Sequence, residues 1–171
     1  MKTHAMNRQR GVTLIIVLLL LLIMTLLGLA SFKSTIMQEK MSSNLLDRSI
    51  GFQAAEAALR EAEAVAATGP TFPASGACDA NGLCPAPTGS ATDRWRDSST
   101  VWRNATVSLG GLNASAPQYI IEPLGSAPNW PGCDREIPAQ PNCFSPRYRI
   151  TARSTAANRA RVVLQINYAA P

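Results

Sequence analysis

The sequence predicts an α+β fold, in which a long N-terminal helix, transmembrane and then amphipathic, packs on a small antiparallel C-terminal sheet. Three observations predict it. Residues 11–32 carry no charge, no proline occurs before Pro70, and apolar and polar residues alternate near the end of the chain. A helical segment followed by short strands is typical of the α+β class.

The first part of the helix is expected to cross a membrane. The uncharged run is about 22 residues, which at 1.5 Å per residue spans roughly 33 Å, enough for a bilayer core of about 30 Å. A secretory signal cleaved near Leu29-Ala30-Ser31 is the alternative. Basic residues flank the run almost equally on both sides, so the positive-inside count leaves its orientation open. The cysteines favour an exported C-terminus, because disulfides form outside the cytosol.

The helix is expected to continue through an amphipathic half at residues 33–67 and to stop at Gly69-Pro70. Glu56 and Arg60 stand four apart, in the favourable order for a surface ion pair. Glu56, Glu61 and Glu63 are all assigned to a solvated face. Gly28 and Gly51 are either soft points of the helix or neutral small residues. One apolar stripe is expected to pack on the sheet: Met37, Met41, Leu45, Phe52, Ala55, Leu59 and Ala62.

Residues 68–171 are expected to form the exported globular domain. Residues 68–100 read as loop, and strands are expected at 101–109, 118–124, 147–154 and 159–168, the last two as a hairpin. Arginines alternate with apolar residues near the end, as on the solvated face of a sheet: Arg147, Arg149, Arg153, Arg159 and Arg161.

The four cysteines are all in this domain, and an even number in an exported domain indicates two disulfides. Three pairings are possible, and sequence proximity favours Cys78–Cys84 and Cys133–Cys143. Neither spacing resembles a zinc knuckle. Each disulfide would contribute about 2–4 kcal/mol by restricting the unfolded chain.

The sequence offers little chemistry, and no catalytic residue, metal site or cofactor is predicted. Its single histidine, His4, lies at the far N-terminus, and no phosphate-binding glycine loop is present. The net charge is +5, but Lys2, Arg8 and Arg10 supply three of these charges, so direct nucleic-acid binding is not expected. The tryptophans lie in the loop-rich middle, where they serve either local packing or a partner surface: Trp95, Trp102 and Trp130.

The residues around Gly11 resemble the prepilin leader motif of type IV pilins. In Arg10-Gly11-Val12-Thr13-Leu14-Ile15, a basic leader ends in glycine and an apolar span begins at once. The resemblance implies that a prepilin peptidase removes the leader, residues 1–11, and that Val12 becomes the methylated N-terminus. The mature chain would have 160 residues, the full 171 less those 11. The transmembrane half would then be residues 12–32.

Two further segments resemble the PilX-type minor pilins. The first is Gln38-Glu39-Lys40-Met41, Asn44-Leu45-Leu46-Asp47-Arg48 and the helix from Phe52 to Arg60. The second is the closing hairpin, Tyr148-Arg149-Ile150-Thr151-Ala152 through Val162-Val163-Leu164-Gln165. The resemblance implies a type IV pilin-like fold and a structural, non-enzymatic subunit. Such a subunit sits in the inner membrane with a periplasmic C-terminus and then enters the extracellular pilus.

The same resemblance implies partners and a role. Proteins of this group prime pilus assembly near the fibre tip, together with other minor pilins, the major pilin and a tip adhesin. The organelle serves adhesion, twitching motility and DNA uptake. The sequence departs from most pilins at one place, because Ile16 stands at the fifth mature position, where they carry a glutamate.

Two other functions fit the same features. One is a minor pseudopilin of a type II secretion system, whose tip subunit also lacks the glutamate. The other is a single-pass membrane binding or sensor protein that never polymerises and keeps its leader.

Overall fold

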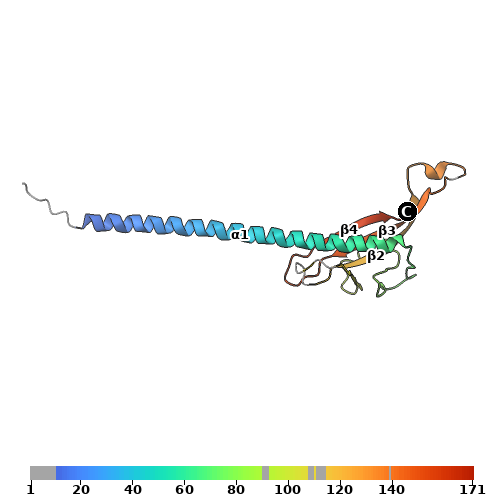
Figure 1. Ribbon diagram of the computed structural model, residues 1–171, viewed down its shortest axis with the longest axis horizontal. Helices are drawn as coiled ribbons and strands as arrows, with labels where there is room; N and C mark the ends of the chain where they lie inside the picture. Colours follow the sequence, from blue (N-terminus) through green and yellow to red (C-terminus); the bar gives the residue numbers. More distant parts are fainter. Residues whose placement is uncertain (1–10, 90–92, 108–109, 111–114, 139) are drawn as a thin grey trace, which may run out of the picture. The chain divides into compact units, whose positions relative to one another are not determined.

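The computed structural model describes residues 11–89, 93–107, 110, 115–138 and 140–171. Its only long helix within those residues, α1, covers Val12–Ala67, so the predicted start and end are confirmed. The chain divides into two compact units, of which the first ends at Asn44 and the second is Leu45–Pro171. Figure 1 shows α1 and the strands, which together have the predicted α+β fold.

In the first unit, α1 begins directly after Gly11, whose φ of 97° lies in the left-handed region that favours glycine. Its large apolar side chains are exposed on every side of the helix. By length and composition this helix could cross a membrane, and nothing in its most apolar window is buried within the protein. A helix that is apolar all round is suited to a lipid environment.

The second unit contains an antiparallel sheet of four strands in the order β1-β2-β3-β4. A short 3₁₀ helix at Cys133–Arg135 lies in the connection between β2 and β3. The strands are β1 at Arg103–Asn104, β2 at Gln118–Pro128, β3 at Phe144–Arg153 and β4 at Val163–Ala169.

Several predicted strand boundaries were wrong. The strand expected at 101–109 is only Arg103–Asn104, and residues 108–109 of that prediction lie outside the described part. The strand expected at 118–124 continues to Pro128 through an irregularity between Pro123 and Gly125, where Gly125 has a φ of 88°. The last strand begins at Val163 rather than at residue 159, because the backbone N–H of Ala160 donates to the Asp47 carboxylate of α1.

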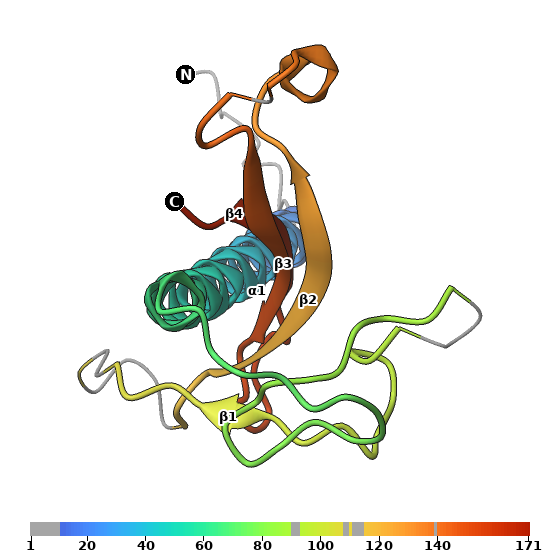
Figure 2. The ribbon, with the colours of Figure 1, turned by 90° about the vertical axis from the view of Figure 1, so that its right-hand side faces the viewer.

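Alanines form most of the α1 face that packs on the sheet, and Figure 2 shows the helix lying against one side of the strands. Ala58, Leu59 and Ala62 contact a layer of large sheet residues that includes Tyr119 and Ile150. Small side chains on the helix leave room for large ones on the sheet, so the two surfaces interlock at close range. Within the described residues, the full buried face is Gly51, Ala54, Ala55, Ala58, Leu59, Ala62 and Ala66.

The predicted apolar stripe was therefore only partly right. Ala55, Leu59 and Ala62 are buried as expected, but Leu45 and Phe52 are 68% and 48% exposed. Met37 and Met41 are also exposed. The prediction assumed that large apolar side chains of the helix would face the sheet, whereas the packing leaves room mainly for small ones.

Gly51 allows the β3–β4 connection to approach the helix closely. A Cβ at this position would lie 3.0 Å from the Ala160 carbonyl oxygen and 3.1 Å from Val162 Cγ2. One helical turn earlier, Asp47 accepts hydrogen bonds from the Arg159 side chain and from Ala160 N–H. The Arg159 hydrogen bond, followed by the Ala160 N–H, holds the pKa of Asp47 below its usual range. Gly51 is thus a packing position. The sequence had suggested either a soft point of the helix or a neutral small residue, and neither interpretation describes this role.

We predict that Gly51→Val will lower the free energy of unfolding of the globular unit by about 1–3 kcal/mol, because the added side chain collides with a backbone carbonyl. Thermal unfolding followed by circular dichroism measures the change. Gly28→Val is the matched control, since a Cβ there meets nothing within 4 Å. Equal melting temperatures for the wild type and Gly51→Val would contradict the close packing.

Candidate functional site

The predicted processing and assembly residues lie at the start of α1. Val12 and Ile16 are 62% and 52% exposed, and no acidic residue occupies the first turn of the helix. The bond between Gly11 and Val12 therefore lies at the junction between the N-terminal segment and the helix. Residues 1–10, the rest of the predicted leader, lie outside the described residues.

Both cysteine pairs are disulfides in the structure, joined as sequence proximity favours: Cys78 to Cys84 and Cys133 to Cys143. The first closes a small loop against the outer edge of β2. There, Cys84 N–H donates to the Ile121 carbonyl at 2.9 Å, and Ile121 N–H donates to the Gly82 carbonyl at 2.9 Å. The second disulfide closes the loop between β2 and β3.

The tryptophans have different surroundings. Trp102 packs with Cys78, Cys84 and Ile120 on the sheet face opposite α1, and the Arg153 guanidinium lies 3.9 Å from its ring centroid. The local-packing interpretation therefore holds for Trp102. Trp130 is 42% exposed in the β2–β3 connection, so it remains the better candidate for a partner surface.

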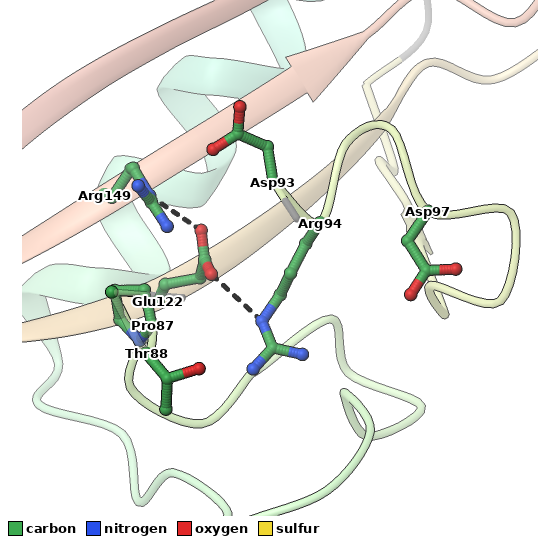
Figure 3. A pocket seen from close by; sticks show the side chains of 8 residues that line it. Pro87, Thr88, Asp93, Arg94, Asp97, Glu122 and Arg149 are labelled. Carbon is green, nitrogen blue, oxygen red and sulfur yellow. Dashed lines mark hydrogen bonds and ion pairs between the residues drawn. The ribbon is translucent and has the colours of Figure 1, made fainter. Parts of the chain in front are cut away.

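A buried ion cluster was missed by the sequence analysis. Glu122 of β2 is only 2% exposed, and its two carboxylate oxygens each accept from a different arginine. Arg94 Nε donates to Oε1 at 3.0 Å, and Arg149 Nε donates to Oε2 at 2.8 Å (Figure 3). Arg94 also donates to the Pro85 carbonyl at 3.3 Å. The cluster thus ties the loop before β1 to the middle of the sheet.

The positions of these groups follow from strand register. Glu122 and Arg149 are directly opposite each other on β2 and β3, and their side chains share the face turned away from α1. The prediction that the arginines lie on a solvated face was therefore wrong for Arg149, which is half-buried beneath the loop. One signal was available: an acidic residue directly after the apolar run 119–121 is unusual in a strand and calls for a basic partner.

A cavity of about 510 Å³ adjoins this cluster. Its lining includes Thr88, Asp93 and Asp97 besides the three ion-cluster residues. Each carboxylate oxygen of Glu122 accepts one guanidinium N–H, so the buried charge is paired within the cluster. No group of three or more potential metal ligands occurs among the residues that the structure describes.

Glu61 also differs from its prediction. Its carboxylate accepts from Thr106 N–H at 2.7 Å and from the Thr106 hydroxyl at 2.9 Å, and the Tyr119 hydroxyl lies 3.5 Å away. It therefore joins α1 to the segment after β1 instead of facing only solvent. Burial raises the pKa of the Tyr119 phenol, with a smaller contribution from Glu61. The predicted Glu56–Arg60 surface pair is present at 3.5 Å.

Two matches to family models identify the family of this chain. The family model for the PilX N-terminal region matches residues 10–60, and that for the C-terminal region of the type IV pilus assembly protein PilX matches residues 74–170. The chain belongs to the PilX family. Curated proteins and solved structures yield no match. This PilX protein is a minor pilin of the type IV pilus, and the second match includes the middle of the chain, where the sequence analysis had found no resemblance.

We predict that Glu122→Gln will lower the free energy of unfolding of this PilX protein by about 3 kcal/mol, because two half-buried guanidinium groups lose their counter-charge. Chemical denaturation measures the loss, and limited trypsin digestion after Arg94 should become faster. Glu56→Gln is the matched control, because its pair with Arg60 is solvent-exposed and is worth about 0.3 kcal/mol. A loss no larger than that of the control would show that the cluster has no structural role.

Proposed function

We propose that this PilX protein is processed between Gly11 and Val12, resides in the inner membrane, and takes an end position in the type IV pilus, where it primes assembly. The observation that carries the proposal is the apolar helix beginning at Val12 with Ile16 in place of a carboxylate. In the domain organisation that follows, residues 1–11 are leader, 12–32 the membrane half of the helix, 33–67 its amphipathic half and 68–171 the periplasmic domain.

The argument for an end position is electrostatic. A free N-terminal amine inside the membrane needs a nearby carboxylate, because an unpaired charge there costs several kcal/mol. In most pilins the glutamate at the fifth mature position is held to fill this need for a neighbouring subunit. Ile16 carries no charge, so this subunit has nothing to offer a neighbour's amine. Such a subunit is tolerated where one of its neighbours is missing.

The exposed apolar residues between the membrane half and the buried alanine face support incorporation into a fibre. Each of them is at least 48% exposed, and none belongs to the described core: Ile36, Met37, Met41, Leu45, Leu46 and Phe52. Large apolar side chains in a periplasmic helix are costly unless covered. Helices of neighbouring pilins, both minor and major, would cover them.

We propose the remaining roles by analogy with the family. A tip adhesin and other minor pilins are the expected partners in priming, and a prepilin peptidase is the processing enzyme. Adhesion, twitching motility and DNA uptake are then functions of the fibre that this subunit helps to start.

We predict that mass spectrometry of the protein from membranes will find a chain beginning at N-methylated Val12. Gly11→Val should keep residues 1–11, because the leader motif ends in glycine and the φ of Gly11 is 97°. Gly28→Val, which changes the same residue type farther along the helix, should be processed normally. Retention of residues 1–11 in the wild type would favour the anchored binding protein that never polymerises.

We predict that immunogold labelling of sheared fibres will find this subunit at one fibre end. Ile16→Glu should allow labelling along the shaft, because the new carboxylate can pair with a neighbour's amine. Ile15→Glu is the matched control, since it adds the same charge one position away and should not extend the labelling. Abundant wild-type subunit along the whole shaft would contradict an end position.

A further inference from the structure

We propose that the free edge of β4 binds an extended, uncharged segment of a different polypeptide, which adds a further antiparallel strand to the sheet. Strand addition of this kind uses main-chain hydrogen bonds for affinity and alternate side chains for specificity. The choice of partner rests on the proposed anchoring in the membrane, but the inference does not depend on where in the fibre the subunit sits.

The two edges of the sheet differ sharply. The outer edge of β2 is covered at its start by β1 and by the Cys78–Cys84 loop, in which Leu83 forms a bridge with Ile121. At the other edge, β4 pairs with β3 and with no other segment in the described part of the chain. Figure 1 shows β4 as the outermost strand on its side of the sheet. The rest of the β2 edge carries Pro123, Pro128 and the irregularity at Gly125, which disfavour further pairing, whereas the β4 edge is open.

The register identifies the main-chain groups that face outward. Ser154 N–H donates to the Val162 carbonyl, and Ala170 N–H donates to the Pro146 carbonyl. In an antiparallel ladder, hydrogen-bonded residues alternate with residues whose N–H and C=O point away. The even-numbered residues of β4 therefore bond to β3. The outward groups belong to four residues, for which no main-chain partner occurs among the described residues: Val163, Gln165, Asn167 and Ala169.

β4 has none of the features by which proteins usually protect an edge strand. Natural edges are blunted by charged side chains, proline, bulges, short length or a covering segment. β4 is seven residues long, contains no charged residue and no proline, and pairs with β3 without a register shift. An exposed edge of this kind is a template for another strand.

The side chains of β4 indicate what the added strand should look like. Leu164, Ile166 and Tyr168 pack on the α1 side of the sheet but are only partly buried, because the layer ends with them. Apolar residues at alternate positions of an added strand would extend this layer. Gln165 and Asn167 are exposed on the other side and favour uncharged polar neighbours.

The direction of the strand favours a partner other than a second copy. β4 and the second half of α1 run in the same direction (Figure 1). If two copies paired their β4 strands antiparallel, their α1 helices would run in opposite directions. Under the proposed function, α1 anchors every copy in the same membrane with the same polarity, which disfavours such an opposed pair. An antiparallel β4–β4 pair between two copies is therefore disfavoured, and we assign the added strand to a different polypeptide.

The test uses the full mature chain in detergent micelles and, as the probe, a capped peptide of alternating valine and threonine. Hydrogen exchange by NMR should slow at the four outward amides, Val163, Gln165, Asn167 and Ala169, when the peptide is added. A peptide methylated on its alternate backbone nitrogens should not slow them. Exchange at Leu164 and Ile166 should change little, since their N–H groups already bond to β3.

Gln165→Pro should weaken peptide binding about tenfold, the equivalent of one lost main-chain hydrogen bond of about 1.4 kcal/mol. Gln165→Ala, which removes the side chain and keeps the N–H, should bind like the wild type. The wild-type exchange data stand even if the proline variant misfolds. Unchanged exchange, or equal binding of the methylated peptide, would overturn the proposal. Protection of these amides without peptide, together with a dimer in analytical ultracentrifugation, would assign the edge to a second copy and overturn the proposed partner.

Discussion

The packing of an alanine face of α1 on the large residues of the sheet is the constraint on which the globular domain depends. Ala58 and Ala62 are fully buried against a layer that includes Tyr119 and Ile150. A larger side chain on the helix would push the sheet away, and a smaller one on the sheet would leave a cavity. This fit sets the distance between the two layers. It also determines which face of the helix remains available for other subunits.

Different interactions stabilise the opposite face of the sheet. A loop with little regular structure covers it, and two devices keep that loop in place. The Cys78–Cys84 disulfide packs with Ile120 and Trp102, and Glu122 draws Arg94 of the loop toward Arg149 of the sheet. An ion cluster of this kind adds little net stability compared with apolar packing, but it disfavours every arrangement that leaves a charge unpaired. It therefore specifies where the loop lies.

Two exposed features of different kinds stand out among the described residues. Exposed apolar side chains at residues 36–52 of α1 suit the helices of neighbouring pilins, whereas the open β4 edge presents main-chain groups. A pilin that used both could be held by helix packing and by strand pairing at once. The first contact would be common to subunits that pack by their helices. The second would select a particular partner.

The sequence by itself determined the features that depend on local composition. The apolar run and the absence of proline predicted the helix from Val12 to Ala67, and the alternation near the end predicted the hairpin of β3 and β4. The resemblance to PilX proteins rested on the same segments. Only the tertiary structure decided features that depend on residues distant in sequence. Glu122 became a buried ion partner because the register placed Arg149 opposite it and a loop brought in Arg94. Likewise, the helix buries its alanines because the sheet supplies the large side chains of the core. β4 begins later in the sequence than predicted because the Asp47 carboxylate binds the Ala160 N–H.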